Sequence, residues 1–260
     1  MLTDRRTFLA TAGALASGLT RQSSAGDDSS NSERPRAGKI RGLAFDAFPI
    51  IDATPVTTRV QAMFGGKADL LLSAWRTRQF EYAWLRTLGG AYADFWQTTR
   101  AALVFAAASN GMTLTDAGCD ELMQSYRELK AWPDVRPALE SLRQAGIRMA
   151  FLSNFTAAML DAAIENSGLQ GFFEPHLTTD RVRAFKPDPR AYSMGPKAFR
   201  VHREEIVFCA AAGWDAAGAK WFGYPTFWLN RSHQPAEELG VGADAVGAGM
   251  EDLVKFVLPG

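Results

Sequence analysis

Four short apolar runs recur along the chain. They cover residues 42–45, 147–152, 206–209 and 225–229. Runs of this length are typical of strands that are buried in a parallel sheet. Helix-like stretches, such as residues 157–166 and 189–199, lie between the runs. This alternation predicts a three-layer, Rossmann-like α/β core in which helices cover both faces of a parallel sheet.

Residues 55–130 have a different pattern, because helical spacing replaces the short apolar runs. The stretch 70–88 carries an apolar stripe with Arg76 off it, and the stretches 92–108 and 115–129 are also helix-like. The stripe consists of Leu71, Trp75, Tyr82 and Leu85. The sequence therefore predicts an all-helical block at this point of the chain.

The helical block interrupts the α/β pattern directly after its first strand. It can add helices to the core, or it can form a lid over the carboxyl end of that strand. We favour the lid, because it brings Arg76 towards Asp46. The expected organisation is a core domain of residues 39–54 and 131–260, with a helical cap of residues 55–130 inserted in it.

Residues 1–25 have the pattern of an export signal. The pair Arg5-Arg6 precedes an uncharged, weakly apolar stretch, and small residues occupy positions 23–25. This arrangement resembles a twin-arginine signal peptide and predicts export to the periplasm or another extracytoplasmic compartment. The alternative is a short amphipathic helix or tail. The stretch is too short and too weakly apolar for a stable membrane span, which needs about 20 apolar residues.

The segment after the signal is polar and contains Ser, Pro and Gly, so residues 26–38 are expected to form a flexible linker. The whole chain of 260 residues is 47% hydrophobic and 22% charged, which excludes a disordered or fibrous protein. Its 28 Lys and Arg residues equal its 28 Asp and Glu residues, so no basic excess exists to bind nucleic acid.

Cysteine and histidine are scarce. Cys119 and Cys209 lie far apart in the sequence, which excludes a disulfide scaffold and a Cys-rich zinc site. The three histidines are scattered, which argues against a His-based metal cluster. We therefore expect the chemistry to depend on carboxylate, Lys, Arg and hydroxyl groups, without a metal or another cofactor.

Reactive side chains follow the predicted strands. Asp46 ends the first run, Ser153 and Asn154 follow the next, and Asp215 comes shortly after the third. The carboxyl ends of parallel strands form the ligand-binding edge of such a sheet. Each residue also has a structural interpretation: a helix cap, a capping loop or, for Lys186 before Pro187, a surface turn. Their order and spacing together favour one site.

That order and spacing resemble the haloacid dehalogenase superfamily, and more narrowly the (S)-2-haloacid dehalogenases, or haloacid dehalogenases of type II. The similarity covers about residues 39–245, and Tyr192 stands six positions after Lys186 as it does in the family. The stretch from Trp75 to Arg86 is distinctive of the dehalogenases. The segments that carry the resemblance are residues 45–48, 73–82, 152–154, 213–220 and 226–231.

The resemblance implies a reaction in two steps. Asp46 attacks C2 of a short (S)-2-haloacid, expels halide with inversion and becomes an ester. Lys186 keeps Asp46 ionised, because a nearby opposite charge favours the charged form. Water, polarised or positioned by Asp215, then attacks the ester and releases an (R)-2-hydroxyacid.

The resemblance also implies which residues bind the substrate. Arg76 and Asn154 hold the halide, and Ser153 with backbone N–H groups holds the carboxylate. Four aromatic residues complete the expected substrate and halide site: Phe48, Phe95, Tyr192 and Trp214. The family leads us to expect no cofactor, a small-molecule 2-haloacid as partner, and a homodimer.

Two other functions stay open. A phosphatase of the superfamily needs a second Asp two positions after the nucleophile and acidic residues that hold Mg²⁺. This position is Phe48, which exchanges no proton, so phosphoryl transfer is disfavoured. The second alternative is a slow or silent relative that binds small carboxylates.

The second alternative comes from departures from the family pattern. The usual Tyr-Gly-Thr after the nucleophile is replaced by residues 48–50, Phe-Pro-Ile. The usual Ser-Ser-Asn before Trp214 is replaced by residues 210–212, three alanines. Polar groups that orient Asp46 or water are thus replaced by apolar ones. The residues needed to form the ester on Asp46 are present, whereas fewer polar residues support its hydrolysis by water.

Overall fold

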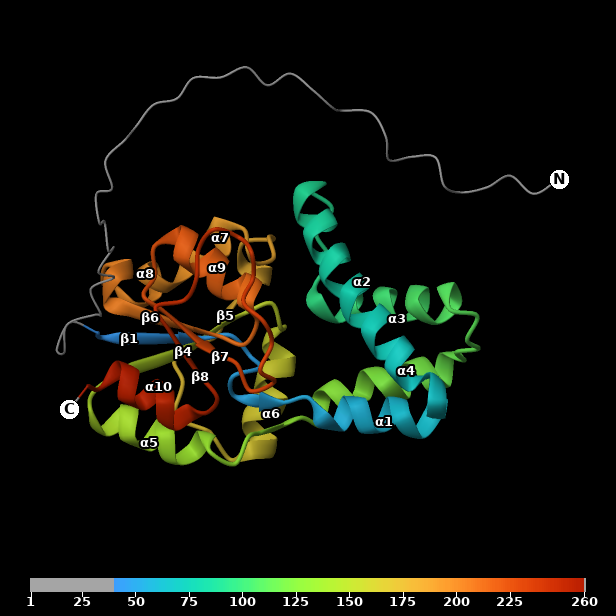
Figure 1. Ribbon diagram of the computed structural model, residues 1–260, viewed down its shortest axis with the longest axis horizontal. Coiled ribbons are helices and arrows are strands. Elements are labelled where there is room, and N and C mark those ends of the chain that lie inside the picture. The colour runs from blue at the N-terminus through green and yellow to red at the C-terminus, as the bar shows by residue number, and fades with distance from the viewer. Residues whose placement is uncertain (1–39, 260) are drawn as a thin grey trace, which may run out of the picture. The chain divides into compact units, whose positions relative to one another are not determined.

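The computed structural model describes residues 40–259 and has a parallel sheet of six strands at its centre (Figure 1). The predicted signal peptide and linker lie outside the described residues. The sheet order is β5-β4-β1-β6-β7-β8, and all neighbouring strands are parallel. In this order, the strands are Leu177–Thr178, Arg148–Ser153, Gly42–Phe45, Ile206–Ala210, Thr226–Leu229 and Ala245–Gly247. The four predicted strands are confirmed.

Helices cover both faces of this sheet, as predicted (Figure 1). One face is covered by α5 (Val135–Gln144), α6 (Ala157–Ser167) and α10 (Met250–Val257), and the other by α7 (Pro189–Tyr192), α8 (Met194–Phe199) and α9 (Gly213–Phe222). Successive strand residues alternate between the two cores, because Leu43 and Phe45 face one and Ala44 faces the other. The three-layer α/β fold class is therefore confirmed.

The predicted helix over residues 189–199 is two helices that break at Ser193. Pro196 has no N–H group, so it leaves the Tyr192 carbonyl without a helical donor. The Tyr224 hydroxyl donates to that carbonyl instead, at 2.5 Å. The break therefore satisfies the backbone and sets the direction in which Tyr192 enters the core.

The block of residues 54–124 consists of four helices that lie to the right of the sheet in Figure 1. They are α1 (Thr54–Phe64), α2 (Ala68–Leu88), α3 (Phe95–Ser109) and α4 (Asp116–Gln124). The chain enters and leaves this block through a two-stranded antiparallel ribbon, β2 (Ile51–Asp52) and β3 (Lys130–Ala131). The all-helical prediction for this block is confirmed, although α4 ends in a 3-10 turn at residues 125–127.

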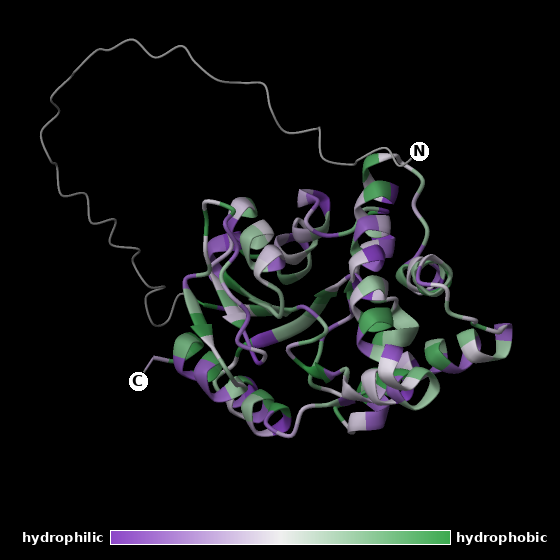
Figure 2. Ribbon diagram, turned by 45° about the vertical axis from the view of Figure 1, so that its right-hand side comes forward, coloured by the Kyte–Doolittle hydropathy of each residue, from purple (hydrophilic) through white to green (hydrophobic). Residues whose placement is uncertain are grey.

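Helix α2 is amphipathic along its length, and hydrophilic and hydrophobic residues alternate on it in Figure 2. Leu71 and Trp75 are buried, as the predicted stripe requires. The prediction that Leu85 belongs to the same stripe is wrong, because Leu85 is 60% exposed. Within residues 40–259, no helix is long and apolar enough to cross a membrane.

The central position of β1 brings the functional strand ends together. Phe45 pairs with Phe151 of β4 and with Cys209 of β6, so the three strands end at one edge. The Asp46 N–H group donates to the Cys209 carbonyl at 3.0 Å and continues the pairing by one residue. This edge carries Asp46 between Ser153 and Ala210.

Candidate active site

A buried ammonium group joins two carboxylates at this edge of the sheet. Lys186 Nζ lies 2.8 Å from Asp46 Oδ1 and 2.5 Å from Asp215 Oδ2. The Lys186 and Asp215 side chains are 1% and 2% exposed, whereas that of Asp46 is 14% exposed. A buried charge is stable only when it is paired, and here it is paired twice. Asp46 is the member of the cluster that a ligand can reach.

The electrostatics of this cluster keep Lys186 charged. Burial alone would lower the pKa of Lys186, but Asp215 and Asp46 together raise it above its ordinary value. Burial, together with the charge of Asp46, raises the pKa of Asp215 to about 6, although Lys186 and Tyr192 act to lower it. At neutral pH the cluster therefore holds an ammonium group, and Asp215 is poised to take up a proton.

Tyr192 holds the other side of Asp215. Its hydroxyl donates to Asp215 Oδ1 at 2.7 Å, and the residue is fully buried. Helix α9 approaches it closely, because a Cβ atom on Gly218 would lie 2.5 Å from the Tyr192 hydroxyl oxygen. Tyr192, expected at the substrate, is thus placed behind Asp215, where it orients that carboxylate.

Asp46 is oriented by the loop that follows β1. The Phe48 N–H group donates to Asp46 Oδ2 at 3.3 Å, while Oδ1 accepts from Lys186. The Phe48 ring packs edge-to-face on Phe155, with ring centroids 5.2 Å apart. The backbone at position 48 therefore orients the carboxylate, and its side chain offers no group for proton transfer.

Ser153 and Asn154 lie beside Asp46 on the end of β4, and both are buried. Asn154 Oδ1 accepts from the Lys186 N–H group at 3.0 Å, and Ser153 Oγ accepts from the Phe155 N–H group at 3.1 Å. Because its oxygen is engaged, the Asn154 side chain presents its NH₂ group as a donor.

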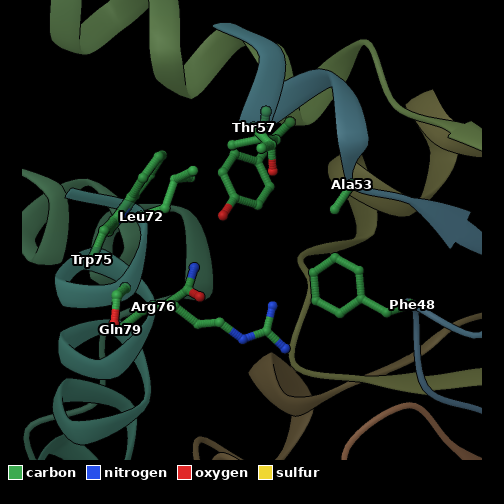
Figure 3. A pocket seen from close by; sticks show the side chains of 10 residues that line it. Phe48, Ala53, Thr57, Leu72, Trp75, Arg76 and Gln79 are labelled. Atoms are coloured by element: carbon green, nitrogen blue, oxygen red, sulfur yellow. The ribbon is translucent and has the colours of Figure 1, made fainter. Parts of the chain in front are cut away.

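Arg76 of α2 points into a cavity of about 230 Å³, towards Phe48 (Figure 3). Its guanidinium carbon lies 5.9 Å from the Phe48 ring centroid and 5.6 Å from that of Phe80. Within residues 40–259, Arg76 forms no ion pair or hydrogen bond, so its positive charge is free for an anion.

A second cavity, of about 590 Å³, lies on the other side of Arg76. Its walls come from α2, from the start of α9 and from the loop at residues 232–237. Ala211, Ala212 and Trp214 line it at the carboxyl end of β6. Ala211 and Ala212 contribute no polar side chain to this cavity, so its polar groups come from α2 and from the loop, through residues such as Thr77, Gln234 and Glu237.

The other two predicted aromatic residues have different places. Trp214 lines the larger cavity and packs edge-to-face on Phe80 at 5.1 Å. Phe95 lines neither of these two cavities. Its buried ring packs on Phe155 and Phe185, the neighbours of Asn154 and Lys186. Phe95 therefore supports the site from behind.

The structure also adds residues that the sequence analysis did not select. Gln79, Thr57 and Tyr126 line the smaller cavity, and Gln79 Nε2 donates to Thr99 Oγ1 at 2.6 Å. The sequence does hold a signal for Gln79, because a polar residue four positions after Trp75 interrupts the buried apolar stripe. Tyr126 had no such signal, because only the packing of four helices brings it to the cavity.

A metal-binding constellation is absent from the part of the chain that the structure describes. Among residues 40–259, no group of three or more His, Cys, Asp or Glu side chains is placed to hold a metal ion. The expectation of a reaction without a metal remains a prediction.

Comparisons with known proteins agree with this site. The family model of haloacid dehalogenase-like hydrolases matches residues 2–223. Haloacetate dehalogenase H-2 of Moraxella sp. (strain B) is 37% identical over 220 residues, which cover 84% of this chain and 98% of that protein.

Solved structures show the same relationship. The crystal structure of the L-2-haloacid dehalogenase RSc1362 superposes with a TM-score of 0.82 at 39% identity and covers 84% of this chain and 98% of that chain. The L-2-haloacid dehalogenase from Xanthobacter autotrophicus with covalently bound chloropropionic acid has a TM-score of 0.77 at 29% identity, with the same coverage. The chain therefore belongs to the haloacid dehalogenase-like hydrolases and is homologous to the (S)-2-haloacid dehalogenases.

Proposed function

We propose that this protein hydrolyses the carbon–halogen bond of short (S)-2-haloacids and releases (R)-2-hydroxyacids through an ester on Asp46. One observation carries the proposal: a ligand can reach the Asp46 carboxylate, and a buried Lys186 ties it to Asp215. The homologues and structural neighbours named above support a carbon–halide hydrolase.

The first step forms the ester. An oxygen of Asp46 attacks C2 from the side opposite the halogen, the C–O bond forms, and the halide leaves with the electrons of the C–X bond. Attack from behind inverts C2. Lys186 and the Phe48 N–H group orient the carboxylate by donating to its two oxygens. The free charge of Arg76 and the NH₂ group of Asn154 stabilise the departing halide.

The second step breaks the ester. Water attacks the Asp46 carbonyl carbon and transfers a proton to Asp215, whose pKa of about 6 suits a base at neutral pH. The bond between that carbon and the substrate oxygen then breaks, Asp215 returns the proton to this oxygen, and the hydroxyacid leaves with an oxygen from Asp46. The Lys186 ammonium stabilises the negative charge that develops on the ester oxygen.

Helices α1–α4 act as a cap in this proposal. Helix α2 supplies Arg76 to both cavities and Phe80 to the larger one, while the core supplies the carboxylates and Lys186. Water is then held between the two parts rather than in bulk solvent. The proposal also includes two expectations from the sequence, a homodimer and export directed by residues 1–25.

The direct test is halide release from the two enantiomers of 2-chloropropionate. We expect release from the (S) enantiomer, little from the (R) enantiomer, and an (R)-lactate product by chiral chromatography. Release without inversion would contradict attack by Asp46 from behind. Release of phosphate from phosphate monoesters with no halide release would favour the phosphatase alternative.

A second candidate is favoured by one observation, the apolar triplet at residues 210–212 beside the larger cavity. A site in which the end of β6 offers no polar side chain to a water molecule can bind a small carboxylate and turn it over slowly or not at all. Calorimetric binding of chloropropionate without halide release would support this candidate. Halide release over many turnovers would exclude it.

A further inference from the structure

One helix connects the free cation of the site with the loop that carries Lys186. Arg76, Phe80 and Trp84 follow at four-residue spacing on α2, so they form one stripe along it. The Arg76 guanidinium carbon lies 5.6 Å from the Phe80 ring centroid, and the Phe80 and Trp84 rings stack at 6.0 Å with a 24° angle. The stripe is therefore continuous from the cavity to Trp84.

Trp84 contacts the backbone of Lys186, the residue at the centre of the buried ion cluster. Its indole Nε1–H group donates to the Lys186 carbonyl at 3.2 Å. Its ring packs edge-to-face on Trp214 at 5.6 Å, and Trp214 directly precedes Asp215. One side chain of α2 thus contacts Lys186 itself and the neighbour of its partner Asp215.

Two more contacts tie the same loop to the helical block. Thr87, one turn after Trp84, accepts from the Phe185 N–H group through Oγ1 at 3.0 Å. Tyr92, after the end of α2, donates to Asp180 Oδ1 at 2.6 Å and packs its ring on Phe185 at 4.8 Å. The loop before Lys186 is therefore bound at several points, and among the described residues of the helical block only Trp84 donates a hydrogen bond to Lys186 itself.

Side chains from the two parts of the molecule hold both polar backbone groups of Lys186. Asn154 of the core accepts from its N–H group, and Trp84 of α2 donates to its carbonyl. The lysine side chain is a flexible four-carbon stem, so its ammonium stays between two carboxylates only if its backbone is fixed. Both contacts are made to the backbone of Lys186, and neither involves its ammonium group.

We propose that Trp84 is a positioning residue, which couples the docking of α2 to the placement of Lys186 between Asp46 and Asp215. The kinetic test of this inference rests on the proposed function. Trp84 acts through Lys186 and donates nothing to the substrate. Its loss therefore slows the steps that use the Lys186 charge and leaves the binding of the haloacid through Arg76 in place.

The test compares the same change at two tryptophans. Trp84→Phe keeps a ring for packing on Phe80 and Trp214 but removes the donor to Lys186. Trp221→Phe is the matched control, because Trp221 is 58% exposed on α9. We expect Trp84→Phe to lower kcat for (S)-2-chloropropionate by about 2- to 10-fold, the size of one hydrogen bond, with KM unchanged within about twofold. Trp221→Phe should leave both constants near those of the unmodified protein.

The pH profile separates positioning from a general structural loss. The charged and titratable groups around the ammonium are Asp46 after β1, Asp215 in α9 and Tyr192 in α7. When the Lys186 ammonium is held less firmly, its interaction with the Asp46 and Asp215 carboxylates weakens. The alkaline limb of kcat should therefore move to lower pH in Trp84→Phe and stay in place in Trp221→Phe.

A chemical readout does not depend on turnover. Acetic anhydride labelling followed by peptide mass spectrometry reports the access of reagent to Lys186, whose side chain is 1% exposed. Labelling of Lys186 should be faster in Trp84→Phe than in the control. Equal labelling and equal kcat in the two variants would overturn the inference. Faster labelling in a protein without halide release would support the positioning and contradict the proposed function instead.

Discussion

The two sides of Asp46 differ in their chemistry. On one side, Lys186, Asp215 and Tyr192 form a buried network in which every polar group has a partner. On the other side, Ala211 and Ala212 line a cavity of about 590 Å³ and contribute no polar side chain. Asp46 thus lies between a complete ion cluster and the end of β6, where three successive alanines follow Cys209.

This difference separates the two half-reactions. Attack by Asp46 on C2 needs an oriented carboxylate, which Lys186 and the Phe48 N–H group hold, and a partner for the halide, for which we propose Arg76 and Asn154. Attack by water on the ester needs a positioned water molecule as well as a base. Asp215 supplies the base, but residues 210–212 supply no side chain that positions water. We therefore expect ester formation to be faster than ester hydrolysis.

The largest effect is expected from removing the nucleophile. Asp46→Asn should lower halide release by at least about 10³-fold, because a neutral amide is a poor nucleophile. The matched control is Asp161→Asn, which changes an exposed carboxylate on α6 in the same way. Steady halide release from Asp46→Asn from the first turnover, with an unchanged peptide mass, would show that Asp46 is not the nucleophile. A late, rising trace would instead report deamidation back to Asp.

The second effect concerns the three alanines at residues 210–212. Excess (S)-2-chloropropionate should give a burst of about one halide per active site, followed by a slower steady rate. Losing a positioned base or water typically costs about 10²–10⁴ in rate. Introducing Ala210→Ser together with Ala212→Asn should speed the slow phase by about tenfold or more, without enlarging the burst. Rapid-quench halide assays measure both phases.

The variant carries a structural risk, because Ala210 is fully buried and an unpaired polar group there costs about 1–3 kcal/mol. Ala210→Ser and Ala212→Asn are therefore also made singly, and the melting temperature of each is measured. A folded double variant with the same slow phase would show that water positioning does not limit turnover. Absence of a burst in the unmodified protein would remove the difference between the two half-reactions.

The third effect is the pH dependence of the slow phase. Because burial and Asp46 raise the pKa of Asp215 to about 6, its carboxylate takes up a proton as the pH falls through 6. The slow phase should then fall about tenfold per pH unit below 6, since only the ionised form accepts a proton from water. Stability should change in the opposite sense. The pKa of Asp215 is higher in the folded than in the unfolded protein, so this residue stabilises the fold fully at pH values below its unfolded pKa. The contribution is lost as the pH rises through 6.

Stopped-flow halide release and urea unfolding across pH 4–8 test this prediction together. The Asp215→Asn variant should lose the acid limb of the slow phase and the matching part of the stability profile. An acid limb that persists in this variant would assign the limb to another group.

The smallest effect is expected at Tyr192. Its hydroxyl lowers the pKa of Asp215, so Tyr192→Phe should move the acid limb of the slow phase to higher pH by about half to one unit. The burst should be unchanged, because Tyr192 does not contact Asp46. Tyr224→Phe is the control, since its hydroxyl donates to the Tyr192 carbonyl rather than to Asp215. Equal acid limbs in the two variants would contradict an orienting role of Tyr192.

The sequence predicts the sheet and its functional edge well, for a physical reason. Apolar runs of residues mark strands buried on both faces, and the residues that follow such runs in a parallel sheet meet at one edge. This argument alone brings Asp46 near Asn154 and Asp215. The place of Lys186 comes from the family resemblance, since nothing local in its loop shows that its side chain is buried.

Contacts between the helical block and the core could not be predicted in this way. Periodicity placed Leu85 on the apolar stripe of α2, but the angle at which α2 meets the core leaves it exposed. Trp84 of α2 reaches the Lys186 carbonyl, and Tyr126, in the 3-10 turn after α4, reaches the smaller cavity. These positions depend on how helices pack in three dimensions, which the spacing of residues within one helix does not determine.

The central claim, that Asp46 becomes an ester whose carbonyl carbon is attacked by water, is tested most directly by one turnover in H₂¹⁸O. Excess enzyme reacts with (S)-2-chloropropionate, and mass spectrometry then measures the isotope in lactate and in the peptide that contains Asp46. The account predicts ¹⁸O in Asp46 and unlabelled lactate. Labelled lactate with an unlabelled Asp46 would show that water attacks C2 directly, and it would contradict the account.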